Sequence, residues 1–354
     1  MLSVLASWLD DRSAVVVIDN TNSEPGPLKN SVYQGTVLGP LLWNCHYEDA
    51  RRASEHGFDE NIFADDLNCF KVFDRRAPND EVYAEPQSRQ SSLHRWGAAN
   101  QVTFDPGKES FHIIDRRAPA GADFRNLGVT FDTKLIMNTA AHEVALQAGW
   151  RLRCLLRGCR FFSRYVLVRL HKSQVFSYVE FGAPALYYAP DFYLAPVDNI
   201  QARFLEEAGI SALEALTEFH LAPLSTRQDI AMMGLLRRIA LGSAPPLFSS
   251  FIRRETRPLF LRCLRNQASR HDKQLQDPID GTRTFMLERS VLGLIYTYNM
   301  LPQHRVNEKS TSGFQRKLQL AVKRLAATGE PNWPHLLRTG IKTMSATSFQ
   351  SCFI

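Results

Sequence analysis

Short apolar runs separated by polar turns dominate the first 132 residues of the chain. Residues 14–18 (AVVVI) are β-branched and predict a strand, and the polar stretch TNSEPGPLKN after them predicts an exposed loop. A helix is expected over about residues 40–53, because Pro40 fits the first turn of a helix. Residues 62–64 and 67–70 are strand-like runs separated only by Asp65 and Asp66. This spacing predicts a β-hairpin with two carboxylates at its tip.

The stretch between this hairpin and residue 132 predicts further mixed structure. Polar residues 75–92 predict a loop or an exposed helix. WGAANQVTFDPGKESF, which starts at Trp96, predicts a helix end, a turn at Pro106 and Gly107, and a strand that Lys108 enters. FRNLGVTFD, residues 124–132, alternates apolar and polar positions as a further strand does. We expect an α/β (α+β) fold in which the hairpin's sheet also includes the strand near Phe104.

Helical periodicity is typical of the rest of the chain. Helices are expected over three stretches there: residues 200–210, 226–242 and 314–325. Breaks are expected at residues 244–247 (APPL) and 266–282. Four residues of a later apolar run are expected in the core: Leu292, Leu294, Ile295 and Tyr296. Trp333, next to Pro334, is expected to pack in the fold.

The segment between Trp150 and Val179 contains seven Lys and Arg residues and no Asp or Glu. At 3.6 residues per turn, four of its arginines are predicted to share one helix face: Arg153, Arg157, Arg160 and Arg164. An apolar stripe is expected on roughly the opposite side: Leu155, Cys159, Phe162 and Val166. A row of guanidinium groups suits a phosphate backbone. The alternative is a basic face that is only hydrated.

Composition and charge narrow the class of protein. With 354 residues, 44% apolar and 22% charged, the chain has ample material for a core, and two or three domains are expected. The net charge of +6 favours an anionic partner. Six cysteines without paired spacing suggest reduced thiols in an intracellular protein. Since no apolar stretch can cross a bilayer and no signal-peptide pattern is present, we expect a soluble nuclear or cytoplasmic protein without a membrane partner.

Asp65 and Asp66 are the strongest candidates for chemistry. Adjacent carboxylates repel each other, and a hard divalent cation such as Mg²⁺, which prefers oxygen ligands, relieves that repulsion. In nucleotidyl transfer two such ions stabilise the attacking and leaving oxygens, which requires carboxylates held on a rigid sheet. The pair is therefore a candidate catalytic site and a candidate ligand set for Mg²⁺. The alternative is a surface turn whose preference for Asp these residues satisfy.

Four motifs follow one another in the chain: YQGTVLGP, FADDL, WGAANQVTFDPGK and FRNLGVTFD. In this order and at these separations, they resemble the successive palm motifs of reverse transcriptases from non-LTR retrotransposons of the jockey type. LVRLHKSQVFSYVEFGAPALYY resembles the thumb segment that follows, and HLAPLSTRQDIAMMGLL and RSVLGLIYTYNMLP resemble a downstream region often fused to it. The resemblance implies an RNA-directed DNA polymerase that uses Mg²⁺, an RNA template, a DNA primer and deoxynucleoside triphosphates.

The resemblance also implies roles for individual residues. It makes Asp65, and beside it Asp66, the metal ligands of the FADD motif. Lys108 matches the lysine near the triphosphate, where a cation neutralises charge or protonates the pyrophosphate leaving group; the alternative is a strand-end lysine in water. Gln34 and Gly35 match the Gln-Gly pair beside the template strand and the incoming nucleotide.

Three further positions complete this comparison. Phe63 stands where many relatives have Tyr, and both side chains are flat. Leu127 and Gly128 match the hairpin that supports the primer end, where Gly permits close backbone approach.

One catalytic carboxylate of the family is expected to be missing. In the family it lies on a strand well before the Gln-Gly pair, and only 33 residues precede Gln34 here. Asp19 directly follows AVVVI, but its segment resembles the stretch after that strand, so Asp19 is not expected to be a ligand.

The expected layout has three parts: a partial palm over 1–132, a helical thumb-like region over 133–195, and a helical C-terminal region over 196–354. Two functions stay open. The chain is a reverse-transcriptase segment, or it is a catalytically inactive truncated remnant that at most binds nucleic acid.

Overall fold

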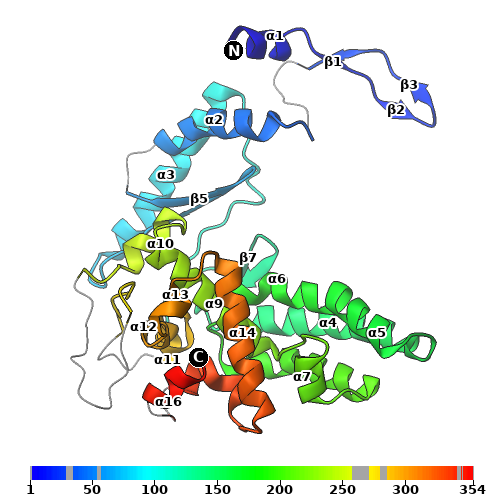
Figure 1. Cartoon of the computed structure of the whole chain (residues 1–354). Helices are drawn as coiled ribbons and strands as arrows, with labels where there is room; N and C mark the ends of the chain where they lie inside the picture. Colours follow the sequence, from blue (N-terminus) through cyan, green and yellow to red (C-terminus); the bar gives the residue numbers. More distant parts are fainter. Residues whose placement is uncertain are drawn as a thin grey trace. The chain divides into compact units, whose positions relative to one another are not determined.

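The computed structural model describes residues 2–28, 35–53, 57–256, 271–279, 285–340, 344 and 346–353. The chain divides into two compact units, Met1–Phe111 and His112–Ile354 (Figure 1). The first boundary expected from the sequence, after residue 132, lies further along the chain than this division. Residues 112–132, which include the fourth of the motifs above, therefore belong to the second unit.

The run AVVVI forms strand only in part and lies at the surface. Residues 2–28 form one helix and four very short strands: α1 (Leu2–Leu9), β1 (Ser13–Ala14), β2 (Val17–Ile18), β3 (Thr21–Asn22) and β4 (Gly26–Pro27). β1 pairs with β4 and β2 with β3, both antiparallel. Val16 and Ile18 are more than half exposed, and Asp19 lies in the turn after β2 with a φ of 48°. The predicted strand is thus two separate pieces without a buried face.

Two helices cover one face of a hairpin in the rest of the first unit. Its described elements are α2 (Gly39–Arg52), β5 (Asp59–Phe63), β6 (Asp66–Phe70) and α3 (Asn79–Asn100). The predicted helix over 40–53 is confirmed, and Pro40 lies in its first turn, where a missing N–H costs nothing. Tyr47 of α2 and Trp96 of α3 are buried, and Ile62 and Leu67 of the hairpin pack against them. The polar residues 75–92 are part loop and part α3.

The strand expected near Phe104 does not form. α3 ends at Asn100, and among the described residues the hairpin's sheet contains β5 and β6 alone. The Phe104 ring instead stacks on His94 of α3, with centroids 5.6 Å apart. A Cβ added at Gly97 would lie within 3 Å of the Phe104 ring, so only glycine permits this approach. The segment therefore folds back onto α3 and does not extend the sheet.

The second unit begins with a hairpin followed by packed helices. Its first elements are β7 (Phe124–Asn126), β8 (Val129–Phe131), α4 (Asn138–Arg157), α5 (Arg164–Leu170), the π-helical η2 (His171–Phe176), α6 (Ser177–Leu186) and α7 (Asp191–Ala208). The pattern in residues 124–132 predicted one strand, and the structure has two joined by a turn. α4 packs along α6 and α7, drawn in green in Figure 1. Leu152, Val175 and Phe204 are buried between them.

The remaining helices surround a second core. The described helices are α8 (Ala212–Thr217), α9 (Leu224–Ala240), α10 (Pro246–Phe251), α11 (Phe285–Arg289), α12 (Ile295–Asn299), α13 (Gln303–Val306), α14 (Thr311–Ala327) and α16 (Ala346–Ser351). Short 3-10 or π segments join some of them: η1 (Cys159–Phe161), η3 (Val291–Leu294), η4 (Trp333–His335) and η5 (Leu336–Gly340). α14 packs on α9 around the buried Met233, Tyr298 and Phe314. The helices predicted within residues 200–210, 226–242 and 314–325 are confirmed.

The expectations for individual core residues are largely met. Leu294 and Ile295 are fully buried, Leu292 is half-buried, and Trp333 packs against the same core. Tyr296 was expected in the core, but it is 49% exposed, because it lies on the outer side of the short helix α12. Part of the break expected over residues 266–282 lies outside the described residues.

A buried carboxylate links three helices of the second unit. Asp229 of α9 is 1% exposed and accepts hydrogen bonds from the Tyr187 hydroxyl at 2.6 Å and from Arg338 Nε at 2.8 Å. The Arg338 guanidinium also lies 4.6 Å from the centre of the Tyr187 ring. Burial raises the pKa of Asp229, and Arg338 opposes that shift. Charge pairing inside the core therefore ties α9 to η5 and to the end of α6.

His171 is a buried titratable group for which the described part of the chain provides no hydrogen-bond partner. Its ring is fully buried, stacks on Phe204 with centroids 3.9 Å apart, and neither ring nitrogen bonds to a described residue. Burial, with a smaller contribution from Lys172, lowers the pKa of His171 to about 4. The unfolded chain, where the pKa is near 6.5, takes up a proton over a pH range in which the folded chain does not. His171 therefore favours folding above pH 6.5 and loses this effect as the pH falls towards 4.

We predict that His171→Leu flattens the fall in stability between pH 6.5 and pH 4.5. The wild-type chain should lose about 2–3 kcal/mol more than the variant over this range, from a shift of 1.4 kcal/mol per pKa unit. Burial raises the pKa of Asp198 to about 6, so Asp198 makes the folded state more stable as the pH falls. Asp198 is present in both proteins, and the difference in unfolding free energy between wild type and variant therefore isolates the effect of His171. Urea unfolding followed by circular dichroism measures it. Parallel curves would assign the pH dependence to other groups.

Candidate functional site

The FADD segment forms the tip of a tight antiparallel hairpin. Ile62 pairs with Leu67 and Phe63 with Asp66, so the connecting turn consists of Ala64 and Asp65. The predicted hairpin is confirmed with a shift of one residue, because Asp66 already belongs to β6. Ala64 has a φ of 55°, a left-handed conformation that costs a residue with a side chain about 1 kcal/mol. Its carbonyl accepts a hydrogen bond from Trp43 Nε1 at 2.7 Å, which ties the turn to α2.

Strand alternation decides which side chains of the hairpin face solvent. Ile62 and Leu67 pack towards the helices, so Phe63 and Asp66 project from the opposite face. The Phe63 side chain is 64% exposed. Burial raises the pKa of Tyr47 on α2, with further contributions from Cys69 and then from the nearby charge of Asp65. The tip therefore presents an exposed aromatic ring beside two exposed carboxylates.

Two carboxylates are the metal-ligating groups that this tip offers. Within the described ranges, no three His, Cys, Asp or Glu side chains lie together in a group that could hold a metal ion. Mg²⁺ keeps several waters in proteins and is often bound by one or two carboxylates together with substrate phosphates. Asp65 and Asp66 supply that number of carboxylates. A second closely spaced ion would need a further carboxylate.

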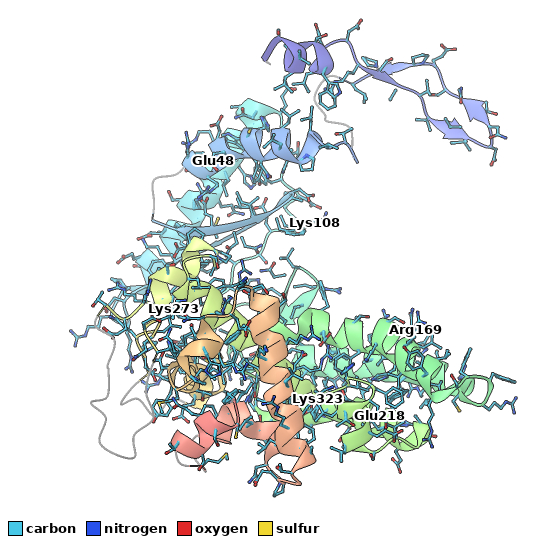
Figure 2. The ribbon with its side chains drawn as sticks, viewed as in Figure 1. Glu48, Lys108, Arg169, Glu218, Lys273 and Lys323 are labelled. Carbon is cyan, nitrogen blue, oxygen red and sulfur yellow. The ribbon has the colours of Figure 1, made fainter. Side chains whose placement is uncertain are left out.

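Lys108 lies in a turn that follows α3, labelled in Figure 2. Its backbone N–H donates to the carbonyl of Asp105 at 3.0 Å, and its side chain is exposed. The next residue, Glu109, accepts a hydrogen bond from His94 Nε2 of α3 at 2.8 Å. The predicted strand at Lys108 is wrong, because this turn is fastened to α3. The lysine nevertheless belongs to the same unit as the hairpin.

The other residues implied by the resemblance lie in separate places. Gln34 lies outside the described residues. Gly35 is exposed and has a φ of +81°, a conformation that suits glycine. Leu127 and Gly128 form the β7–β8 turn with φ values of 46° and 84°, as in the type I′ turns that join tight hairpins. A Cβ added at Gly128 would lie 3.6 Å from the Phe181 ring of α6.

The four arginines do not share one helix face. α4 ends at Arg157, Gly158 follows, η1 (Cys159–Phe161) is a 3-10 turn, and α5 begins at Arg164. The four side chains are exposed, but they come from three elements: Arg153, Arg157, Arg160 and Arg164. Their predicted common face is wrong because the helix ends at the glycine. Of the expected apolar stripe, Leu155 and Cys159 pack inwards, whereas Phe162 and Val166 are exposed.

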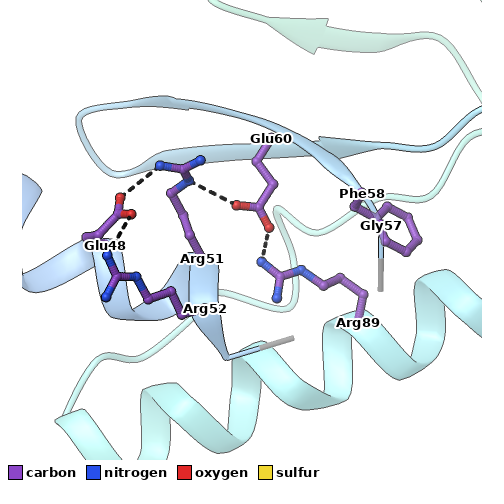
Figure 3. Close-up of a pocket in the computed structure, with 7 residues that line it drawn as sticks. All are labelled: Glu48, Arg51, Arg52, Gly57, Phe58, Glu60 and Arg89. Atoms are coloured by element: carbon purple, nitrogen blue, oxygen red, sulfur yellow. Dashed lines mark hydrogen bonds and ion pairs between the residues drawn. The ribbon is translucent and has the colours of Figure 1, made fainter. Parts of the chain in front are cut away.

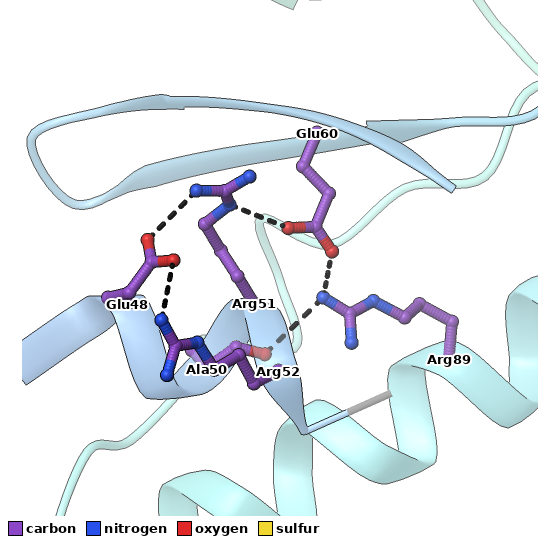
Figure 4. Close-up of polar contacts among 6 residues, drawn as sticks. All are labelled: Glu48, Ala50, Arg51, Arg52, Glu60 and Arg89. Carbon is purple, nitrogen blue, oxygen red and sulfur yellow. Dashed lines mark hydrogen bonds and ion pairs between the residues drawn. The ribbon is translucent and has the colours of Figure 1, made fainter. Parts of the chain in front are cut away.

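A buried ion pair beside the hairpin was not predicted from the sequence. Glu60 of β5 and Arg89 of α3 form an ion pair with side chains only 8% and 3% exposed (Figure 4). Arg51 Nε contacts the other Glu60 oxygen at 3.3 Å, and Arg89 also donates to the Ala50 carbonyl at 3.4 Å. Glu60 occupies a core-facing position two residues before Ile62. The alternation of core-facing and solvent-facing positions along β5 was the signal in the sequence for this pair. A carboxylate at a core-facing position needs a cationic partner.

These charges line a small cavity of about 190 Å³ between α2, β5 and α3 (Figure 3). The residues that line it are Glu48, Arg51, Arg52, Gly57, Phe58, Glu60 and Arg89. Glu48 accepts from Arg51 at 2.8 Å and lies 3.7 Å from Arg52. Each described guanidinium of the cavity therefore has a carboxylate partner, and the arrangement holds the hairpin against the helices.

No family model, curated protein sequence or solved structure matches the chain. Among the described residues, no helix is long and apolar enough to span a bilayer.

We predict that Glu60→Gln destabilises the first unit by about 3 kcal/mol, because Arg89 is left as a buried charge without its partner. Replacing both residues together, by Glu60→Leu and Arg89→Met, should recover most of this loss. Hydrogen exchange of the α3 amides measures the effect. The matched control is Glu48→Gln, which removes a pair whose Glu48 side chain is 40% exposed and should cost at most about 1 kcal/mol. Equal effects of Glu60→Gln and Glu48→Gln would contradict a structural role for the buried pair.

Proposed function

We propose that the chain is a segment of an RNA-directed DNA polymerase of the non-LTR retrotransposon type. The observation that carries the proposal is the FADD hairpin, which has Asp65 and Asp66 exposed at its tip on a sheet packed against two helices. A polymerase needs its carboxylates on a rigid support from which they reach metal and phosphate together. The motif order in the sequence supplies the second support.

Each candidate residue has a chemical task in this proposal. Asp65 and Asp66 hold Mg²⁺, which, when bound, stabilises negative charge on the phosphate oxygens in nucleotidyl transfer. Lys108 neutralises the triphosphate or protonates the leaving pyrophosphate. Phe63 offers a flat apolar surface on the same face as Asp66.

The remaining assignments concern the nucleic acid. The resemblance assigns Gln34 and Gly35 to contacts with the template and the incoming nucleotide, and Leu127 and Gly128 to contacts with the primer end. The exposed arginines bind phosphates of an RNA template and a DNA primer.

A second candidate function is a catalytically inactive fold that binds nucleic acid. It is favoured by one observation: no third carboxylate joins Asp65 and Asp66 within the described residues. Two-metal transfer requires ligands that clamp both the attacking and leaving oxygens. The two candidates differ in turnover, whereas both allow metal and nucleic-acid binding.

We predict that the chain binds a deoxynucleoside triphosphate in the presence of Mg²⁺. The double variant Asp65→Ala, Asp66→Ala should weaken this binding at least about tenfold, because the two carboxylates hold the ion that the phosphates also ligate. Isothermal titration calorimetry measures the affinity. The matched control is Asp10→Ala with Asp11→Ala, an adjacent and exposed pair elsewhere in the same unit. Unchanged affinity in the Asp65 and Asp66 variant would refute the metal site.

Primer extension on an RNA template measures turnover by the 354-residue chain itself. We expect no extension by the 354-residue chain alone, because one hairpin pair leaves the metal ligation incomplete, and each factor of ten in rate corresponds to about 1.4 kcal/mol of barrier. Extension that depends on Mg²⁺ and disappears in the Asp65 and Asp66 variant would establish an active polymerase and exclude the inactive fold.

The arginines give a prediction about salt. Affinity for a primer–template duplex should fall with salt, and replacing all four by alanine should flatten the slope of log K against log salt by about two to four units, because each phosphate contact contributes about one. The residues replaced are Arg153, Arg157, Arg160 and Arg164. Fluorescence anisotropy at several salt concentrations measures the slope.

A control with the same loss of charge removes four other exposed arginines: Arg75, Arg76, Arg203 and Arg324. If both variants flatten the slope equally, the effect reflects net charge and not a binding surface.

A further inference from the structure

The connection between α4 and α5 is an ordered tip with exposed aromatic rings. We call residues 157–166 the α4–α5 tip. Phe161 is 72% exposed, Tyr165 is 66% exposed and Phe162 is 46% exposed. Apolar side chains gathered this densely outside a core mark an interaction surface more often than a structural need.

Local contacts hold the tip in a defined shape. Ser163 caps α5, its hydroxyl accepting from the Val166 N–H at 3.4 Å. A Cβ added at Gly158 would lie 3.3 Å from the Phe162 ring, so glycine lets that ring fold back against the end of α4. Phe162 is therefore partly engaged within the tip. Phe161 and Tyr165 remain as the two rings with most of their surface free.

Cationic groups alternate with these rings. Arg157, Arg160 and Arg164 are exposed, and the Arg160 guanidinium lies 4.8 Å from the centre of the Phe161 ring. Glu214 lies 3.7 Å from Arg164 and is the acidic partner found for the tip among the described residues. The surface therefore combines positive charge with flat apolar faces, and both properties belong to the same few residues.

We propose that the α4–α5 tip binds single-stranded nucleic acid, with unpaired bases stacking on Phe161 and Tyr165 and phosphates paired with the three arginines. Aromatic rings bind every base through its π face, and guanidinium groups follow the backbone. In a duplex the base faces are already stacked on each other, so the rings gain nothing there. The tip consequently prefers unpaired strands, such as a template ahead of its duplex.

This inference rests on the proposed nucleic-acid partner, but it does not use the metal site. A lipid surface is the main alternative, since Arg and Phe also occur together in interfacial helices. Such helices present one continuous apolar face, whereas here Arg160 lies over the Phe161 ring and Arg164 precedes Tyr165 in the chain. The alternation fits a strand that offers bases and phosphates in turn.

The test uses a double variant of the full chain, in which Phe161→Ala and Tyr165→Ala are combined, and compares it with the wild type. Binding to a fluorescein-labelled 12-nucleotide single strand, as DNA and as RNA, should weaken at least about tenfold by anisotropy, given the usual contribution of a stacked base. Duplex affinity should change less than about twofold, and the salt slope should stay the same, because no charge is removed. Phe161→Tyr with Tyr165→Phe keeps both rings and should bind as the wild type does.

The matched control removes one Phe and one Tyr from other exposed sites in the same unit, by Phe192→Ala and Tyr296→Ala. Equal loss in this control, or equal loss for duplex and single strand, overturns the proposal. Binding of phosphatidylserine vesicles that disappears in the Phe161 and Tyr165 variant, without any effect on oligonucleotides, would assign the tip to a lipid surface. Failure at the tip leaves nucleotide binding at Asp65 and Asp66 unaffected, so the two proposals are separable.

Discussion

The ion pair between Glu60 and Arg89 determines how the candidate site faces solvent. Successive residues of a strand point to opposite sides, so the position of Glu60 also determines the positions of Ile62, Phe63 and Asp66. A slip of one residue would turn Glu60, together with Ile62, away from the helices and bury Asp66 without a partner. The same slip would take the Glu60 carboxylate away from Arg89. The Arg89 charge would then be buried without a partner, because its side chain is nearly excluded from water. The orientation of the two carboxylates thus depends on a charge pair that lies outside the proposed metal site.

Local signals in the sequence predicted the local parts of this arrangement. The turn residues between two apolar runs predicted the hairpin, and Pro40 predicted the start of α2, because each signal acts over a few residues. The observed turn lies one residue earlier in the sequence than the predicted one, because Asp66 pairs with Phe63 and so belongs to the strand. Helical periodicity alone predicted a common face for Arg153 and Arg164. Periodicity does not indicate where a helix ends, so it did not predict that α4 stops before Gly158.

Contacts between distant residues were beyond such signals. Phe104 packs on His94 and does not join the sheet, and the choice depends on the space that Gly97 leaves open. The buried Asp229 is 109 positions from Arg338 in the sequence, and no local pattern around either residue predicts that the two side chains pair. For the candidate site, the residues proposed to supply chemistry were recognisable as motifs, whereas the residues that hold them in place depend on the tertiary fold.

The π-helical turn between α5 and α6 accommodates an extra residue without changing the packed faces of the helices on either side of it. A π-helix contains one residue more per turn than an α-helix, and His171–Phe176 takes up that residue without ending the helix. If one residue were deleted there, the extra residue of the π turn would be lost, and a continuous α-helix would keep α6 in nearly the same orientation relative to α5. Val179 and Ala183, both buried, would still face their neighbours. The same deletion inside α6 would instead turn every later residue of that helix by about 100°, so a change of one residue in length is absorbed at the π turn and not in the α-helix after it.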